Sequence, residues 1–139
     1  SGRNPEYLIE QQIKSVPFLR NSTLEIIPTG YILIDGGTNS SVLKISKTTP
    51  IPQENIQLAT ATAIAGMYKG KQLIYLEAGS GAKNPVNSQL ISEVKKNIAI
   101  PLIVGGGIRT KEQLSNAYKN GADMVVIGTA FEENIDLLV

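Results

Sequence analysis

The chain has 139 residues, of which 42% are hydrophobic, and its 13 basic and 12 acidic side chains leave a net charge of +1. This near balance gives no strong field for nucleic acid or an anionic membrane, and the absence of cysteine and histidine excludes disulfides, thiolate metal sites and imidazole catalysis within these residues. No apolar run reaches the roughly 18 residues of a membrane span and no signal-peptide pattern opens the chain, so we expect a cytoplasmic protein without a transmembrane segment.

The first residues resemble the loop that joins a strand to a helix, although no strand precedes them. Asn4 and Pro5 suit an N-cap and a first helical position, and apolar residues follow at helical spacing over residues 8–13. We interpret Ser1-Gly2-Arg3-Asn4 as the remainder of such a loop in a truncated barrel. The alternative is a cloning remnant at Ser1-Gly2.

The next segments predict a strand and a long helix. Residues 24–27 and 31–34 are apolar and flank Pro28-Thr29-Gly30, which indicates one strand interrupted by a bulge or bend. A polar, glycine-containing loop over residues 35–41 and a connection with two prolines over residues 46–52 come next. An alanine-rich helix is predicted over residues 53–68, with core-facing positions at Ile56, Ala63, Ile64 and Met67.

From Gln72 onward, short apolar runs alternate with segments of helical period, which predicts βαβ units and a parallel sheet. The runs at residues 73–76, 101–104 and 124–127 are nearly continuous, as in strands covered on both faces. Two apolar helix faces lie between them, one made of Leu90, Ile91 and Val94 and the other of Leu114, Ala117, Tyr118 and Gly121. Thr110 with Gln113 predicts a capping box at the start of the second helix.

This alternation predicts an α/β fold in which residues 1–139 form one unit, the C-terminal half of a parallel (β/α) TIM barrel with about four β/α units. A complete (β/α)8 domain takes about 250 residues, and compact versions about 200. A half-barrel exposes two sheet edges and an apolar face. We therefore expect a completing N-terminal half-barrel, a homo-oligomer, or proteolytic trimming of a longer chain.

Two glycine-rich segments follow predicted strands and indicate a phosphate site. Gly105-Gly106-Gly107-Ile108 and Gly128-Thr129-Ala130 let the backbone approach an anion, and amides at the following helix starts would point toward it. In (β/α) barrels such loops follow the last two strands, at the end where active sites form. The alternative is that these glycines only permit tight turns. Their spacing matches neither a dinucleotide fingerprint nor a P-loop.

Tyr75 and Glu77 alternate along the preceding strand and therefore share one face. If that face is the barrel interior, Glu77 meets the phosphate loops and is available to bind a polyol or to remove a hydroxyl proton. The alternatives are a Glu77 paired with a lysine and a Tyr75 packed in the core with its hydroxyl satisfied. Arg109 is either a phosphate support or a solvated cation, and Asp35 before Gly36-Gly37 suits a plain turn better than a site.

Together these residues resemble the geranylgeranylglyceryl phosphate synthase family, whose bacterial relatives include heptaprenylglyceryl phosphate synthases. The resemblance covers essentially the whole chain, through residues 1–9, Pro28-Thr29-Gly30-Tyr31, residues 75–82, residues 105–109 and Gly128-Thr129-Ala130. The most specific stretch is Tyr75-Leu76-Glu77-Ala78-Gly79-Ser80-Gly81-Ala82.

The resemblance implies a modified TIM barrel that transfers a polyprenyl group, such as geranylgeranyl, from its diphosphate to the hydroxyl of sn-glycerol 1-phosphate, with Mg²⁺. The catalytic candidates are then Glu77 and Tyr75. The glycerol phosphate would contact Tyr75, Leu76, Glu77, Ala78, Gly79, Ser80, Gly81, Gly106, Gly107, Gly128 and Thr129. A Mg²⁺ ligand would lie in the missing N-terminal half, so no metal ligand is assigned in this segment. Ile56, Ala63 and Tyr68 are candidates for an apolar prenyl groove.

Two other functions remain open. A barrel enzyme acting on another phosphosugar or phosphate ester would share the glycine loops, but it need not share residues 75–82. A non-catalytic, phosphate-binding half-barrel is the other alternative, and we expect negligible turnover from these 139 residues alone.

Overall fold

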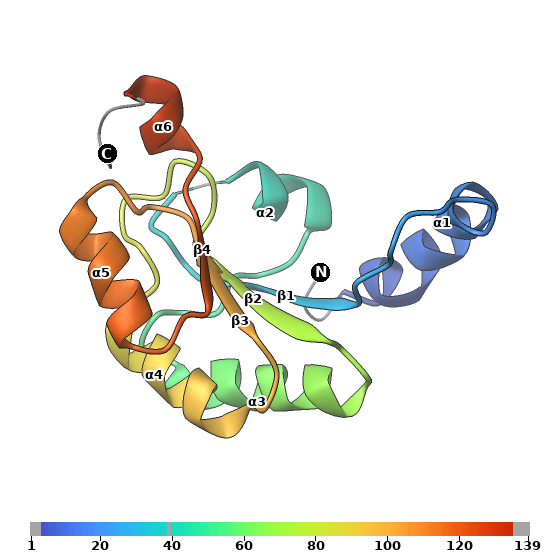
Figure 1. Cartoon of the computed structure of the whole chain (residues 1–139), viewed down its shortest axis with the longest axis horizontal. Helices are drawn as coiled ribbons and strands as arrows, with labels where there is room; N and C mark the ends of the chain where they lie inside the picture. The colour runs from blue at the N-terminus through green and yellow to red at the C-terminus, as the bar shows by residue number, and fades with distance from the viewer. Residues whose placement is uncertain (1–3, 39, 135–139) are drawn as a thin grey trace.

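Four parallel strands form one sheet in the order in which they occur along the chain (Figure 1). The structure, a computed structural model, describes residues 4–38 and 40–134. The strands are β1 (Thr29–Leu33), β2 (Leu73–Glu77), β3 (Leu102–Gly105) and β4 (Met124–Val126). Every neighbouring pair is parallel, so each connection is a crossover that contains a helix. The predicted parallel α/β fold is confirmed.

The helices of the described residues are η1 (Glu6–Glu10), α1 (Gln11–Leu19), α2 (Ser41–Ser46), α3 (Ile56–Tyr68), α4 (Ser88–Asn97), α5 (Lys111–Lys119) and α6 (Thr129–Glu133). Side-chain caps mark the start of α2, α3, α4 and α5 among them. Asn55 and Asn87 cap α3 and α4 through their side-chain oxygens. Thr110 and Gln113 form the predicted capping box of α5.

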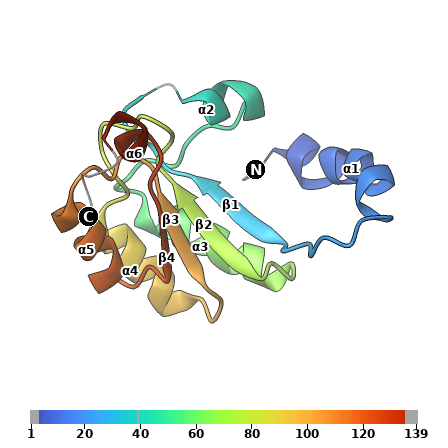
Figure 2. The same ribbon diagram turned by 45° about the horizontal axis from the view of Figure 1, so that its top comes forward.

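The hydrophobic core lies between the sheet and helices α3, α4 and α5, which Figure 2 shows on one side of the strands. Alternate strand residues such as Leu76 and Leu102 are fully buried against this layer. The predicted α4 face of Leu90, Ile91 and Val94 is fully or almost fully buried there. Burying a side chain of this size stabilises the fold by about 1.5–3 kcal/mol.

The opposite face of the sheet carries no helix among the described residues. The strand register places Tyr31, Tyr75, Ile103 and Met124 in one row across this face, and Leu33, Glu77, Gly105 and Val126 in the next. Met124 and Val126 are each 44% exposed. Within the described chain β1 and β4 each have one strand partner, but Ile51 bonds to Leu33 and Asp35 at the carboxyl end of β1. Leu33 and Glu77 are buried, so the accessible part of this face lies mainly toward β4. We refer to the whole face as the uncovered face.

β4 is fastened to β3 by a carboxylate that precedes it. Asp123 Oδ2 accepts hydrogen bonds from Lys95 Nζ at 2.6 Å and from the backbone N–H of Leu102 at 2.7 Å. Hydrogen bonding to Lys95 and to the Leu102 amide lowers the pKa of Asp123. The pair is partly exposed, so its role is to align the two strands rather than to supply much stability.

The predicted strand at residues 24–27 is wrong. These residues lie outside any strand, and Leu24, Ile26 and Ile27 are exposed. The ladder starts at Thr29, opposite Leu73, and the Gln72 amide adds one bond to Pro28 O. Before Gln72 the chain leads back to the end of α3, so no strand lies opposite residues 24–27. Residues 24–27 therefore stay outside the sheet in spite of their strand propensity. The predicted helix at residues 53–68 is correct in kind but begins at Ile56, because Asn55 is its cap.

The N-terminal helices η1 and α1 lie beside β1 and away from the main helical layer (Figure 1). Asn4 accepts a hydrogen bond from the Glu6 amide, as the predicted cap requires, and its Nδ2 donates to Ser46 O at 2.6 Å. The apolar side of these helices stays exposed at Ile9, Ile13, Val16 and Phe18. The interpretation of Ser1, Gly2 and Arg3 concerns residues outside the described ones.

In the part of the chain that the structure covers, no helix is both long and apolar enough to cross a lipid bilayer.

We expect the isolated chain to associate through the uncovered face. Light scattering with intact-mass measurement should give a particle heavier than one chain. Met124→Lys should shift it toward the monomer, because a lysine there would be desolvated in the contact. Tyr118→Lys is the control, since Tyr118 is similarly exposed on α5. A monodisperse monomer of the parent chain would refute this expectation.

Candidate functional site

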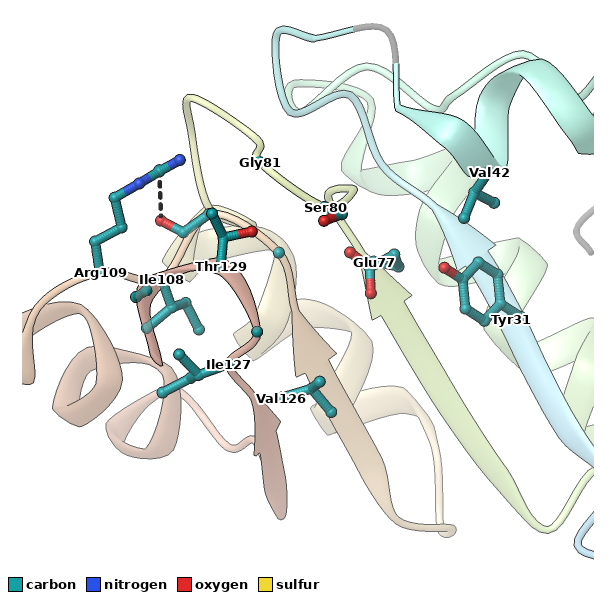
Figure 3. A pocket seen from close by; sticks show the side chains of 14 residues that line it. Tyr31, Val42, Glu77, Ser80, Gly81, Ile108, Arg109, Val126, Ile127 and Thr129 are labelled. Carbon is teal, nitrogen blue, oxygen red and sulfur yellow. Dashed lines mark hydrogen bonds between the residues drawn. The ribbon is translucent and has the colours of Figure 1, made fainter. Parts of the chain in front are cut away.

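A cavity of about 170 Å³ lies at the carboxyl ends of β2, β3 and β4, where three loops meet (Figure 3). It is lined by Tyr31, Val42, Glu77, Ser80, Gly81, Gly106, Gly107, Ile108, Arg109, Val126, Ile127, Gly128, Thr129 and Ala130. The structure therefore brings Glu77 and both glycine-rich loops to one hollow, as the sequence predicts. In Figure 3 Glu77 lies between Tyr31 and the loop that contains Gly81.

Glu77 is held by a backbone amide at the end of β2 and lies beside the Tyr75 phenol. Its side chain is almost buried, and Oε1 accepts a hydrogen bond from the backbone N–H of Gly79 at 2.7 Å. The Tyr75 phenol lies beside the same carboxylate, close enough for the two groups to influence each other's protonation. The hydrogen-bond partner of Glu77 among the described residues is thus a backbone amide, and not the lysine of the structural alternative. A carboxylate has four lone-pair sites, so acceptor capacity remains for a ligand.

Tyr75 lies next to the cavity without lining it. Its ring packs edge-to-face against Tyr31, with the centroids 5.1 Å apart. A Cβ at Gly105 would collide with the Tyr75 hydroxyl, so glycine at that position gives the phenol its place on the uncovered face. Burial, then the hydrogen bond and charge of Glu77, raise the pKa of Tyr75 above the ordinary value of about 10. The phenol therefore keeps its proton beside the Glu77 carboxylate.

The stretch from Tyr75 to Gly81 divides into core and cavity residues. Leu76 and Ala78 are buried in the hydrophobic core, and Gly79 packs against Ser40. Ser80 and Gly81 line the cavity with Glu77. The side chains of Leu76 and Ala78 are thus directed away from the predicted ligand.

Gly106 and Gly107 have structural roles that the sequence does not reveal. Both have positive φ, +85° and +74°. A Cβ on Gly106 would lie 2.6 Å from Glu77 Oε1, and one on Gly107 would lie 2.9 Å from the backbone nitrogen of Pro85. Packing and backbone conformation therefore require glycine at both positions, whether or not a ligand binds. Gly128 differs, because a Cβ there would meet no atom within 4 Å.

Several residues that line this cavity have backbone amides without a protein partner in the described chain. Among the hydrogen bonds of the described residues, none uses the N–H groups of Gly107, Ile108 or Gly128. The two residues before α5 are different, since the Arg109 and Thr110 amides donate to Gln113 Oε1. These two amides are therefore occupied, whereas the glycine-loop amides remain available to a ligand.

Arg109 and Asp35 have local partners. Arg109 Nη1 donates to Ala82 O at 2.6 Å and more weakly to Gly107 O at 3.4 Å, the bond drawn in Figure 3. The guanidinium thus lines the cavity as a link between two loops. The Asp35 carboxylate accepts from the Gly37 amide at 2.8 Å and does not line the cavity, so the turn interpretation is correct.

The residues that sequence reasoning missed are mainly apolar. Tyr31 comes from β1, Val42 from α2, and Val126 with Ile127 from the end of β4. Alternation along β1 is the one signal that was available for Tyr31, which pairs with Tyr75 in the register. The proposed groove of Ile56, Ala63 and Tyr68 does not exist as one surface, because Ala63 is fully buried and Tyr68 is 82% exposed.

The described residues do not make a metal site of their own. No three acidic, cysteine or histidine side chains gather in residues 4–38 and 40–134, and Glu77 is the one carboxylate on the cavity wall. Mg²⁺ prefers oxygen ligands in octahedral geometry, and a single carboxylate supplies little of that. The residues present therefore do not fit the predicted ion.

The raised pKa of Tyr75 predicts a loss of stability in alkali. Its stabilising effect is present below the unfolded value of about 10 and disappears as the pH rises toward the higher folded value. Urea unfolding at about pH 9 and about pH 11 should show a smaller loss for Tyr75→Phe than for the parent. Equal losses in both proteins would contradict this assignment.

Comparison with known proteins identifies a single family. Residues 2–139 match the PcrB family. The chain is 66% identical over 132 residues to a geranylgeranylglyceryl phosphate synthase of Zunongwangia profunda, which covers 95% of the chain and 56% of that protein. For the synthase of Thermococcus kodakarensis the identity is 44% over 133 residues, which covers 96% and 52%.

A solved structure agrees with this family assignment. The crystal structure of (S)-3-O-geranylgeranylglyceryl phosphate synthase from Thermoplasma acidophilum, in complex with its substrate sn-glycerol-1-phosphate, is 36% identical with a TM-score of 0.90. The match covers 99% of this chain and 55% of that one, and the chain spans about half the length of the curated relatives it matches. The predicted resemblance is confirmed, and the chain belongs to the PcrB family.

Proposed function

We propose that the cavity binds sn-glycerol 1-phosphate and that this chain is part of an enzyme that transfers a polyprenyl group to it. The supporting observation is the set of unused amides of Gly107, Ile108 and Gly128 beside the carboxylate of Glu77. A phosphate needs several donors, and a polyol hydroxyl needs an acceptor. The related Thermoplasma acidophilum enzyme has sn-glycerol-1-phosphate bound, which agrees with this pairing.

The proposed reaction is an alkyl transfer. The primary hydroxyl of the glycerol phosphate loses its proton to Glu77, and its oxygen bonds to the allylic carbon of the polyprenyl diphosphate. The carbon–oxygen bond to diphosphate breaks, and diphosphate leaves with the electron pair. Tyr75 and the Gly79 amide fix the carboxylate so that its remaining lone pairs can face the hydroxyl.

We propose that the polyprenyl diphosphate and Mg²⁺ are bound by the whole enzyme, of which this chain is a part. The length of the polyprenyl chain would also be set there. Val126 of the uncovered face and Ile127, which follows β4, border the cavity, and both suit the start of a hydrocarbon chain. The proposed alkyl transfer is written without the metal ion, because the described residues form no cluster that could hold one.

Calorimetric titration tests the ligand. We expect the chain to bind sn-glycerol 1-phosphate more tightly than glycerol 3-phosphate, because the phosphate loops, Glu77 and Ser80 hold the molecule at three points. Gly128→Ala should raise the Kd about tenfold by crowding the phosphate, with little change in Tm, since its Cβ meets no atom within 4 Å.

Gly106→Ala is the contrasting variant. Its Cβ would meet Glu77 Oε1 at 2.6 Å in a backbone with φ +85°, so the Tm itself should fall. Binding of neither glycerol phosphate, or an unchanged Kd for Gly128→Ala, would reject the phosphate site.

Glu77→Gln tests the general base. The assay uses a chimera in which this chain replaces the matching segment of the Zunongwangia profunda synthase. We expect kcat to fall about 100-fold with a nearly unchanged KM for glycerol phosphate, because the amide keeps its shape but cannot take a proton. Glu93→Gln on α4 is the matched control. Near-normal turnover of Glu77→Gln would remove the base assignment.

A further inference from the structure

Gln53 connects two loops that lie under the cavity. Its Nε2 donates to Asp35 O at 2.9 Å and to Pro85 O at 3.0 Å, and its Oε1 accepts from the backbone N–H of Asn87 at 3.0 Å. Both side-chain donors and the carbonyl oxygen are therefore used. One amide joins the loop after β1 to the loop after β2.

Asn87 returns the contact. Its Nδ2 donates to Gln53 O at 2.9 Å, while its Oδ1 accepts from the Leu90 amide and caps α4. The two residues thus form a closed pair of reciprocal hydrogen bonds, which we call the Gln53–Asn87 clamp. It fixes the start of α4 and the end of the loop at residues 78–87.

The clamped loop shapes the cavity. It contains Ser80 and Gly81 on the cavity wall and Ala82, whose carbonyl holds Arg109. The backbone of Asn84 and Pro85 packs directly on Gly107, whose amide is one of the unused donors. Gln53 itself does not line the cavity. A change in the clamp can therefore reach the ligand by moving this loop and not by direct contact.

We propose that Gln53 is a positioning residue, which through Asn87 and Pro85 sets the place of the loop at residues 78–87 and so the affinity of the cavity for glycerol phosphate. The effect on affinity for glycerol phosphate rests on the proposed function. The role of Gln53 in holding the loop does not depend on it. Two further bonds from Lys83 and Asn84 to Gly36 O join the same loops, so loss of the clamp should loosen the loop without unfolding the chain.

Three variants that each replace an amide by a carboxylate of equal size test this. Gln53→Glu keeps the acceptor for Asn87 but loses both donors, and Asn87→Asp keeps the cap of α4 but loses the donor to Gln53. Asn55→Asp is the control, because Asn55 caps α3 and has no bond to the loop. All three add the same charge within the same region.

Hydrogen exchange of the Lys83, Asn84 and Asn87 amides, measured without ligand, reports on the loop. We expect about tenfold faster exchange in Gln53→Glu and Asn87→Asp than in the parent or in Asn55→Asp. The Kd for sn-glycerol 1-phosphate should rise about tenfold in the same two variants. In the chimera, KM should rise while kcat stays within a few-fold.

Exchange that stays within about twofold of the parent in both variants would overturn the proposal. Faster exchange with an unchanged Kd would also overturn it, because the clamp would then hold the loop without positioning a ligand. If the parent chain binds no glycerol phosphate, the proposed function has failed. The exchange measurement then still decides whether the clamp holds the loop.

Discussion

The close packing of three loops at the carboxyl ends of the strands is the constraint on which the site depends. Gly36 lies against the Ala78 carbonyl, Gly106 against Glu77 and Gly107 against the Asn84–Pro85 backbone, at distances that leave no room for a Cβ. With these contacts, Glu77 receives the Gly79 amide and the glycine loops face the same hollow. A side chain at any of the three would separate a wall of the cavity from the sheet that supports it.

The parallel register supplies the second requirement. Because the carboxyl ends of parallel strands lie at one edge, residues at equivalent register positions on β1, β2 and β3 become neighbours across the sheet. Tyr31 and Tyr75 meet in this way, and Tyr75 in turn reaches Glu77. The carboxylate is thus oriented by its own strand and supported by a ring from the adjacent one. The orientation of the Glu77 carboxylate depends on strand pairing as much as on the type of residue.

Much of this was predictable from the residues, and the failures have definite causes. The apolar runs and the Thr110–Gln113 box located β2, β3 and α5, because these signals are local. The apolar residues 24–27 led to a wrong prediction, since a strand needs a partner and the pairing with β2 reaches back only to Pro28. Helix α2 escaped notice because six residues are too few for a period. The sequence located the two glycine loops but not their packing, which depends on contacts from distant parts of the chain.

Since the groups proposed to hold the phosphate are main-chain amides, the identity of most side chains around them has little influence on that contact. Substitutions can therefore change the side chains around the cavity while the amides still bind the anion, provided that the glycines keep their backbone conformations. A protein only 36% identical can accordingly share this backbone at a TM-score of 0.90. Selection on a site of this kind acts on backbone torsion angles more than on side-chain functional groups. The binding of the anion can then persist while few residues are conserved in the sequence.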